Sequence, residues 1–285
     1  MGRRRRLILF AALAAVALAA VALFAWRSAV SDPVERRITI RLPSPALRAR
    51  PLRLALVSDI HLPAIAMTPD RLDRIVRQIN RARPDAILLA GDFVNGRKPR
   101  DAAFRPDLLT APLARLRAPL GVYAVPGNHD HWTDINRVTA ALQAAGITVL
   151  ANDAKALGPI TLVGIDDDLT GYADVDTAMQ LARAAGRGIP IAITHTPDVA
   201  PTLPPDVPLM LAGHTHCGQI VLPVLGSLAL YSPFDERRPF DPHYRCGVIA
   251  DPGRTVIVTA GVGAGEVPFR LGAPPDWWMV TLAGR

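Results

Sequence analysis

Residues 52–61 read LRLALVSDIH, a mostly apolar run that leads directly into an aspartate and a histidine. The same arrangement recurs along the chain, where four more apolar runs end at polar motifs: residues 86–90, 121–125, 189–193 and 209–212. Short runs that are almost continuously apolar are typical of strands buried on both faces. The pattern therefore predicts a sheet with a polar motif at the end of each of these strands.

Helical patterns lie between these predicted strands. Residues 70–81 place apolar side chains three and four positions apart, on one face of a helix: Leu72, Ile75, Val76 and Ile79. Residues 107–117 and 133–145 have similar spacing, and the second range begins at a candidate N-cap, Thr133. Strands alternating with helices indicate an α/β fold with a parallel or mixed sheet, where ligands bind at the carboxyl ends of the strands. We therefore expect the five motifs to meet at one edge.

Composition divides the 285-residue chain into three parts. Residues 1–26 are a basic N-terminus followed by an apolar segment, and residues 27–51 are a tether with one strand-like stretch at residues 37–41. Residues 52–285 form a single large domain, which has ample length for a core. We expect this domain to carry the functional site.

The apolar segment is long enough to cross a membrane. Residues 7–26 are 20 consecutive apolar residues, preceded by four arginines at positions 3–6. A helix of this length spans about 30 Å, the thickness of the bilayer's hydrocarbon core. We expect a retained single-pass anchor. A cleaved export signal is the alternative, because Ala29-Val30-Ser31 offers small residues for cleavage, and the paired arginines could be read by the twin-arginine pathway. A buried soluble helix fits poorly, because the run has no polar face.

The positive charges around this segment are nearly balanced. Four arginines precede it and four follow closely: Arg27, Arg36, Arg37 and Arg41. An excess of Lys and Arg marks the cytoplasmic side of a span. Because the leading arginines are contiguous and undiluted by acidic residues, we expect a bacterial-type inner-membrane protein whose domain is exported to the periplasmic side. A domain on the cytoplasmic side is the alternative.

The net charge of +7 does not indicate a nucleic-acid partner. The first 53 residues hold 11 arginines and two acidic residues, so the rest of the chain holds 21 basic and 23 acidic residues. Domains that track nucleic acid carry positive charge on the folded body. Here the body is nearly neutral, and nucleic acid is an unexpected partner.

Five of the seven histidines fall within the polar motifs. Asp, His and Asn side chains suit Mn, Fe or Zn, and a pair of such ions is a common apparatus for displacement at phosphorus. Each motif alone reads equally well as an ordinary turn or strand end. All five in order, each after a strand, favour one metal site. Its candidate ligands are Asp59, His61, Asp92, Asn128, His195, His214 and His216, with His129 and Asp130 beside them.

Other polar residues have weaker signals. Residues 166–168 are three aspartates after another predicted strand, and we expect a solvated loop there, with a substrate-positioning role as the alternative. Neither His131 nor His243 has an expected role. Cys217 and Cys246 could pair if the domain is exported, or Cys217 could lie near the metals as a bystander, because it follows His216.

The order Asp-x-His, Gly-Asp, Gly-Asn-His-Asp, His, Gly-His-x-His resembles that of the calcineurin-like metallophosphoesterase superfamily, from residue 52 to about residue 259. Residues 261–263, 268–270 and 274–275 resemble its bacterial membrane-anchored branch. Cys217 departs from that branch, which more often has glycine there. The resemblance implies a four-layered α-β-β-α sandwich with a dinuclear metal centre at one end, so that residues 52–285 would be the catalytic domain.

The resemblance also implies roles for the candidate residues. One metal would be held by Asp59, His61, Asp92 and His216, and the other by Asp92, Asn128, His195 and His214, so that Asp92 bridges. His129 would steady developing charge or protonate the leaving oxygen, and Asp130 would orient a histidine ring. The implied activity is hydrolysis of phosphodiester, pyrophosphate or phosphomonoester bonds by a metal-bound hydroxide, with two divalent ions (Mn, Fe or Zn) as cofactors.

The substrate is expected to be lipid-linked or a small phosphorylated molecule, because the domain is nearly neutral and membrane-tethered. The membrane-anchored branch includes enzymes that split UDP-2,3-diacylglucosamine, which makes that nucleotide-lipid a candidate. One observation argues against this candidate: the nucleotide-lipid is made in the cytoplasm, whereas we expect the domain to be exported. Two alternatives remain. The first is a catalytically silent, metal-binding scaffold on the same fold, which would be expected to have lost a metal ligand or His129. The second is a nuclease-like phosphodiesterase, which would be expected to have a basic groove on the folded body.

Overall fold

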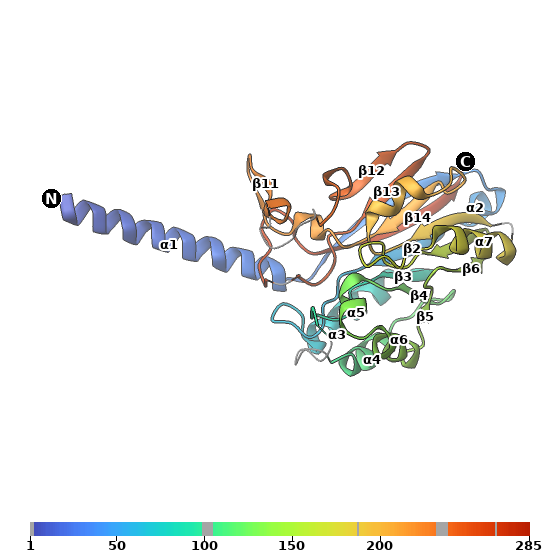
Figure 1. Cartoon of the computed structure of the whole chain (residues 1–285), viewed down its shortest axis with the longest axis horizontal. Coiled ribbons are helices and arrows are strands. Elements are labelled where there is room, and N and C mark those ends of the chain that lie inside the picture. Colours follow the sequence, from blue (N-terminus) through green and yellow to red (C-terminus); the bar gives the residue numbers. More distant parts are fainter. Residues whose placement is uncertain (1–2, 99–104, 187, 232–238, 266) are drawn as a thin grey trace.

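Two six-stranded sheets pack face to face in the computed structural model, which describes residues 3–98, 105–186, 188–231, 239–265 and 267–285 (Figure 1). The first sheet has the order β1 (Val34–Leu42), β14 (Asp276–Gly284), β2 (Leu52–Val57), β3 (Ala86–Ala90), β4 (Val122–Val125), β5 (Thr148–Val149). The second has the order β12 (Gly247–Asp251), β13 (Arg254–Val258), β9 (Leu209–Ala212), β8 (Ile189–Ile193), β7 (Ile160–Gly164), β6 (Asp153–Leu157). A small hairpin joins β10 (Val221–Leu222) to β11 (Gly226–Ser227).

Helices cover the outer faces of both sheets. The α-helices of the body are α2 (Pro45–Ala49), α3 (Pro69–Ala82), α4 (Asp107–Leu113), α5 (Asn128–Thr133), α6 (Ile135–Ala144) and α7 (Val175–Ala185). Short 3₁₀ segments are η1 (Pro197–Thr202), η2 (His216–Gly218), η3 (Leu228–Tyr231) and η4 (Pro242–Tyr244). Strands β2 to β5 are parallel to one another, as are β7, β8, β9 and β13.

Three layers of apolar core separate four layers of secondary structure. Leu54 and Leu56 of β2 point to the cluster between the sheets, where they meet residues of β8 and β9. Ala55 and Val57 alternate to the opposite face and pack with residues of α3, α4 and α6. A third cluster lies between the second sheet and α7. Because successive side chains of a strand point to opposite faces, runs buried on both faces produce this arrangement. The predicted α-β-β-α sandwich is confirmed.

The helix boundaries follow from capping. α3 begins where the Thr68 side chain accepts a bond from the Arg71 N–H, and it ends before Arg83, whose φ of 52° is left-handed. The predicted helix at residues 133–145 is found as α6, which begins at Ile135 rather than after Thr133. Asp134, with an extended φ of −161°, interrupts the helical backbone after α5 and caps α6 by accepting from the Arg137 N–H. Thr133 is therefore the last residue of α5 and not the N-cap of α6.

The N-terminal segment is one continuous helix, α1 (Arg3–Val30), which extends away from the body (Figure 1). It is the only helix of the described residues that is long and apolar enough to cross a membrane. Its side chains are exposed except near the body, where Ala25 and Ala29 are buried. The predicted anchor therefore has the length and exposure that a membrane span requires.

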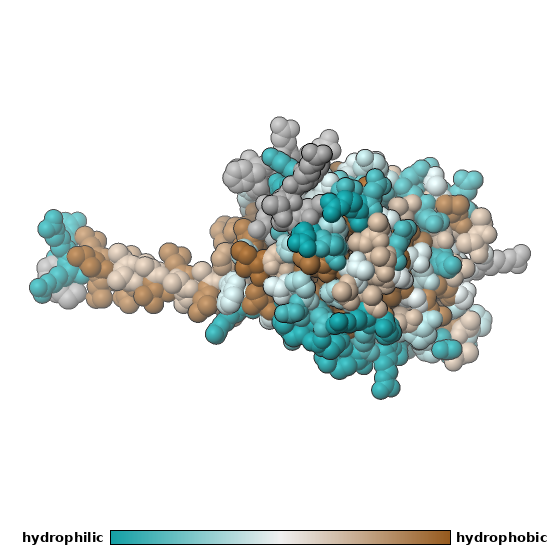
Figure 2. Space-filling model, turned by 90° about the horizontal axis from the view of Figure 1, so that it is seen from below, coloured by the Kyte–Doolittle hydropathy of each residue, from teal (hydrophilic) through white to brown (hydrophobic). Residues whose placement is uncertain are grey.

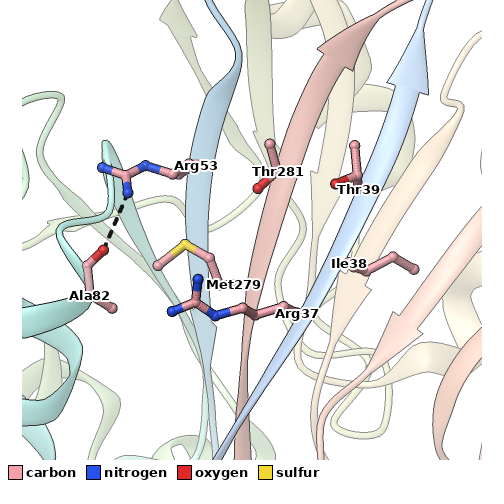
Figure 3. Close-up of a pocket in the computed structure, with 7 residues that line it drawn as sticks. All are labelled: Arg37, Ile38, Thr39, Arg53, Ala82, Met279 and Thr281. Atoms are coloured by element: carbon pink, nitrogen blue, oxygen red, sulfur yellow. Dashed lines mark hydrogen bonds between the residues drawn. The ribbon is translucent and has the colours of Figure 1, made fainter.

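The segment that follows α1 is ordered against the sheet. The expected strand at residues 37–41 is part of β1, which pairs with β14 in parallel along all nine residues. A surface pocket beside this edge has a volume of about 340 Å³ and is lined by Arg37, Arg53, Met279 and Thr281, among others (Figure 3). None of its lining residues belongs to the five motifs. The predicted boundaries at residues 26 and 51 remain predictions.

Candidate metal centre

The five motifs meet at the carboxyl ends of the central parallel strands of both sheets. Asp59 and His61 follow β2, Asp92 follows β3, and His195 follows β8. Asn128 and His129 open α5, directly after β4, and His214 and His216 follow β9. The backbones interlock, because the N–H of Asp59 donates to Gly91 O (3.0 Å) and the N–H of His61 donates to Asp92 O (3.0 Å).

Left-handed backbone is concentrated in these loops. Five of the candidate ligands have positive φ: Asp59 (55°), His61 (51°), Asp92 (56°), His214 (68°) and His216 (49°). Such conformations are unfavourable for residues other than glycine and persist where the surrounding structure fixes them. The strands and the interlocked loops fix them here, which directs all five side chains into one place.

The first group of ligand atoms gathers around Asp59. Its Oδ1 lies 3.4 Å from His216 Nε2 and 3.9 Å from His61 Nε2, and those two nitrogens are 3.1 Å apart. Asp59 Oδ1 is buried without a hydrogen-bond partner among the described residues. A buried carboxylate oxygen left unpaired is unfavourable unless a cation or a donor satisfies it. This set fits a divalent ion of the Mn, Fe or Zn type.

The second group gathers around His195. Its Nε2 lies 3.1 Å from Asn128 Oδ1 and 3.2 Å from His214 Nδ1. Both rings donate their other N–H to a carbonyl, from His195 Nδ1 to Ala90 O and from His214 Nε2 to Pro239 O, each at 2.7 Å. Such bonds fix the orientation of each ring and point its other nitrogen into the cluster, where a metal can bind.

Asp92 lies between the two groups. Its Oδ2 is 3.5 Å from His61 Nε2 and 3.3 Å from His195 Nε2. Its Oδ1 accepts a bond from the His129 N–H at 2.9 Å. One oxygen therefore holds the carboxylate in place, while the other faces both sets of ligand atoms.

Burial and close charges shift the pKa values within this cluster. Burial raises the pKa of Asp59 to about 7 and lowers the pKa of His61 to about 3. Burial alone would lower the pKa of His195, but Asp92 beside it raises that pKa to about 10. Burial alone would likewise raise the pKa of Asp92, but His195 and then His129 hold it well below its ordinary range. Cations entering the cluster would therefore displace protons from Asp59 and His195.

His129 lies at the edge of the first group, and together with His61 and Asp92 it also offers a set of atoms that could hold a metal ion. Its ring is 4.8 Å from that of His61, edge to face, and it contacts Trp132 on another side. Its Nδ1–H donates to Gly96 O at 2.7 Å. The Nε2 atom is thus left as the group that can meet a ligand.

Asp130 has partners that differ from the expected histidine ring. Its carboxylate accepts backbone N–H bonds from Gly127 (2.9 Å), Asp92 (3.0 Å), Phe93 (2.9 Å) and Val94 (3.3 Å). The side chain therefore ties the loop after β3 to the loop after β4. The ring-orienting role inferred for it is replaced by a backbone-clamping one.

Two buried groups near the centre were missed or misjudged from the sequence. Arg270 is fully buried, and it donates to His216 Nδ1 (3.0 Å), Ala260 O (2.6 Å) and Gly263 O (2.9 Å). Asp167 is buried rather than solvated, and it accepts a bond from Thr196 Oγ1 at 2.6 Å, next to His195. An arginine twelve residues beyond the end of β13 gives no sequence signal of burial, and an aspartate cluster favours solvent on composition alone.

The two cysteines are joined by a disulfide. Cys217 follows His216 directly, and Cys246 lies just before β12. Thr215 Oγ1 also donates to Arg245 O (2.7 Å), and the Arg245 side chain donates to Cys217 O (3.0 Å). The loop that carries His214 and His216 is thus bound to the segment before β12 by one covalent bond and two hydrogen bonds.

Gly91→Ala should destabilise the protein strongly. Gly91 has a φ of +79°, and a Cβ there would lie 2.7 Å from His195 Nδ1 and 2.9 Å from Gly127 Cα. Backbone strain and overpacking together should lower the free energy of unfolding by about 2–5 kcal/mol. Gly253 is the matched control, since its φ is +80° and nothing lies within 4 Å of its Cβ position. Gly253→Ala should cost about 1–2 kcal/mol in chemical unfolding of the full chain in detergent. Equal losses would contradict this account.

Several known proteins are similar to this chain in sequence. Among solved structures, a dimetal phosphatase of Danio rerio is 15% identical, with 74% of this chain and 88% of that chain covered at a TM-score of 0.42. A transmembrane protein with metallophosphoesterase domain, also of Danio rerio, is 31% identical over 252 residues, which are 81% of this chain and 53% of that one. An uncharacterized metallophosphoesterase of Aquifex aeolicus is 32% identical over 239 residues, which are 82% of this chain and 86% of that one. A family model of calcineurin-like phosphoesterases matches residues 52–218. The chain belongs to this family of metal-dependent phosphoesterases.

Proposed function

We propose that the chain is a membrane-anchored phosphohydrolase that works with two divalent ions sharing Asp92. The observation that supports this most is the position of Asp92 Oδ2, at 3.5 Å from His61 Nε2 and 3.3 Å from His195 Nε2. A carboxylate between two sets of ligand atoms can neutralise part of the charge of both ions.

The residues divide into two sets around that oxygen. One ion would be held by Asp59, His61, Asp92 and His216, and the other by Asp92, Asn128, His195 and His214. When bound, such ions supply Lewis-acid charge at phosphorus and a nucleophilic water at neutral pH. The chain's own contribution is to keep these side chains in place through Asp130, Arg270 and the carbonyls that fix the rings of His195 and His214.

His129 would act on the substrate directly. Because its Nδ1–H is held by Gly96 O, the ring presents Nε2 to a phosphoryl or leaving-group oxygen. A protonated Nε2 can stabilise developing negative charge or give its proton to the leaving oxygen. This role is distinct from holding metal, so the two can be separated by experiment.

The substrate class follows from charge and placement. A nearly neutral body behind a membrane helix favours a phosphodiester, pyrophosphate or phosphomonoester on a lipid-linked or small molecule over nucleic acid. UDP-2,3-diacylglucosamine is one specific candidate within that class, and it requires the site to face the cytoplasm.

We further propose that α1 is a single-pass anchor in a bacterial-type inner membrane and that the body is exported. The disulfide supports this side, because such bonds persist in oxidising compartments and are rare in the cytosol. A phosphatase reporter fused after Arg285 that is active only in the periplasm is the expected result. Activity of a cytoplasm-specific reporter would instead favour the nucleotide-lipid.

The activity is tested with the full chain in detergent. After chelation, hydrolysis of bis-p-nitrophenyl phosphate and p-nitrophenyl phosphate should be lost, and Mn²⁺ should restore turnover of one or both. Two ions bound without turnover of either compound would point to a pyrophosphate substrate. Full turnover in the metal-free protein would contradict the proposal, and failure to bind metal would favour the scaffold alternative.

A further inference from the structure

The membrane helix joins the body without a flexible linker. The Arg270 N–H donates to Ala25 O at 2.9 Å, while Ala29 packs in a small cluster with Ala66 and Ala264. The Arg71 side chain then donates to Val30 O (3.2 Å), at the last residue of α1, and to Ser31 O (2.6 Å). Side chains that satisfy the last carbonyls of a helix fix its end. The direction of α1 relative to the body is therefore set.

The apolar part of α1 is only just long enough to span the bilayer, so the body must lie directly against the membrane surface. A span needs about 20 apolar residues to cross the hydrocarbon core. The apolar run is residues 7–26, and the contacts with the body begin at Ala25. Trp26 and Arg27, types that favour the membrane–water interface, stand at the same level. The surface of the body around the root of α1 must then lie at the level of the lipid head groups.

Exposed apolar side chains gather on three loops around that root. Ile65 (75% exposed) is next to Ala66, which packs on α1, and Val267 (44%) lies between Ala264 and Arg270, which also contact α1. The β10–β11 hairpin lies against the second of these loops through a bond from the Val221 N–H to Leu271 O. The turn of the hairpin bears Val224, which is fully exposed, and Leu225 (60%).

The figures place these loops on the side of the body from which α1 emerges. Figure 1 shows the hairpin of β11 at this end, and Figure 2 shows hydrophobic residues gathered where α1 meets the body. Single exposed apolar residues are ordinary, but apolar residues clustered on one surface mark contacts with a partner or membrane.

We propose that Ile65, Val224, Leu225 and Val267 form an apolar rim that seats the body on the bilayer spanned by α1. We assign a lipid bilayer as the partner of the rim, because the rim surrounds the end of α1, which is proposed to span that bilayer. The docked end of α1 brings the rim to the interface without any further movement. The solvent-exposed side chains of the rim would thereby reach the boundary between head groups and acyl chains.

Seating would also place the mouth of the metal centre at the membrane. The loop that bears Val267 forms part of its wall, since a Cβ at Gly265 would lie 3.5 Å from His216 Nε2. Gln219 holds this loop, accepting from the Gly265 N–H (2.8 Å) and donating to Val267 O (2.9 Å). A phosphate at head-group level could then reach the site without its lipid leaving the bilayer. This consequence rests on the proposed function, whereas the seating itself does not.

Tryptophan quenching by brominated lipid tests the seating without any assay of turnover. The full chain carrying Trp26→Phe is reconstituted in phosphatidylethanolamine–phosphatidylglycerol vesicles, with or without bromine on the acyl chains. Val224→Trp is added in one variant and Ile65→Trp in a second. Leu181→Trp is the control, because Leu181 is a partly exposed apolar residue of α7, on the side of the body away from α1 (Figure 1).

The added emission at Val224 and Ile65 should fall by roughly half in brominated vesicles, as expected for side chains a few ångströms below the head groups. The added emission at Leu181 should stay unchanged. Because Ile65 and Val224 are on different loops, misfolding of one variant leaves the other as the test. Quenching at both sites no stronger than at Leu181 would overturn the proposal, whether or not the enzyme turns over any phosphoester.

Discussion

Asp92→Asn should lower metal-dependent turnover of an aryl phosphodiester or monoester about 1,000-fold or more. The amide keeps the shape of the carboxylate but removes the negative charge that faces His61 and His195. Loss of one ion from a two-ion site removes several kcal/mol of transition-state stabilisation, and each 1.4 kcal/mol is about tenfold in rate. Turnover and bound Mn²⁺ should be measured on the same sample, and the metal content should drop with the rate.

Asp276→Asn is the matched control for that variant. Asp276 is also a buried carboxylate, and it accepts bonds from Thr259 Oγ1 (2.7 Å) and the Ala260 N–H (2.8 Å) outside the metal-ligand set. Its neutralisation should affect stability more than metal content. If both variants lost metal and turnover equally, the loss at Asp92 would reflect general disruption, and its bridging role would be refuted.

His129→Gln should lower kcat about 10²- to 10⁴-fold while two ions remain bound. The side chain is beside the first group of ligand atoms but is anchored to Gly96 O, and the proposed ligand sets are complete without it. Turnover with a good and with a poor leaving group separates its two roles. A larger loss with the poor leaving group would indicate proton donation, and equal losses would indicate charge stabilisation.

His131 provides the comparison within the same helix. Its Nε2 pairs with Asp166 Oδ1 at 2.8 Å, and its ring stacks on Tyr172. His131→Gln should leave kcat within a few-fold of the wild type, because the ring has structural partners and no place in the proposed ligand sets. A rate at His129→Gln as high as at His131→Gln would remove His129 from the chemistry.

The α/β class could be predicted from the residues because the strands are buried on both faces, whereas the pairing of two sheets in a sandwich was implied only by the family resemblance. Leu54 and Leu56 face one core while Ala55 and Val57 face another, so an almost continuous apolar run was unambiguous. The start of α6 was harder to place. It depends on a single extended residue, Asp134, which caps the helix one position after the predicted N-cap, Thr133.

The convergence of the candidate ligand side chains could be predicted, whereas the groups that hold these side chains in place could not. Strand ends and motif order bring Asp59, His61 and Asp92 together in any sheet of this kind. By contrast, Arg270 reaches His216 from far along the chain, and Asp130 bonds to backbone rather than to a ring. Contacts of this sort depend on the final packing of loops, for which the sequence carries no periodic signal.

Anomalous diffraction from Mn²⁺-soaked crystals of the full chain is the most direct test of the central claim. The account predicts two manganese peaks, one on each side of Asp92 Oδ2. One should face Asp59, His61 and His216, and the other should face Asn128, His195 and His214. A single peak with Asp92 outside its coordination, or no peak among these side chains, would contradict a two-ion centre built around Asp92.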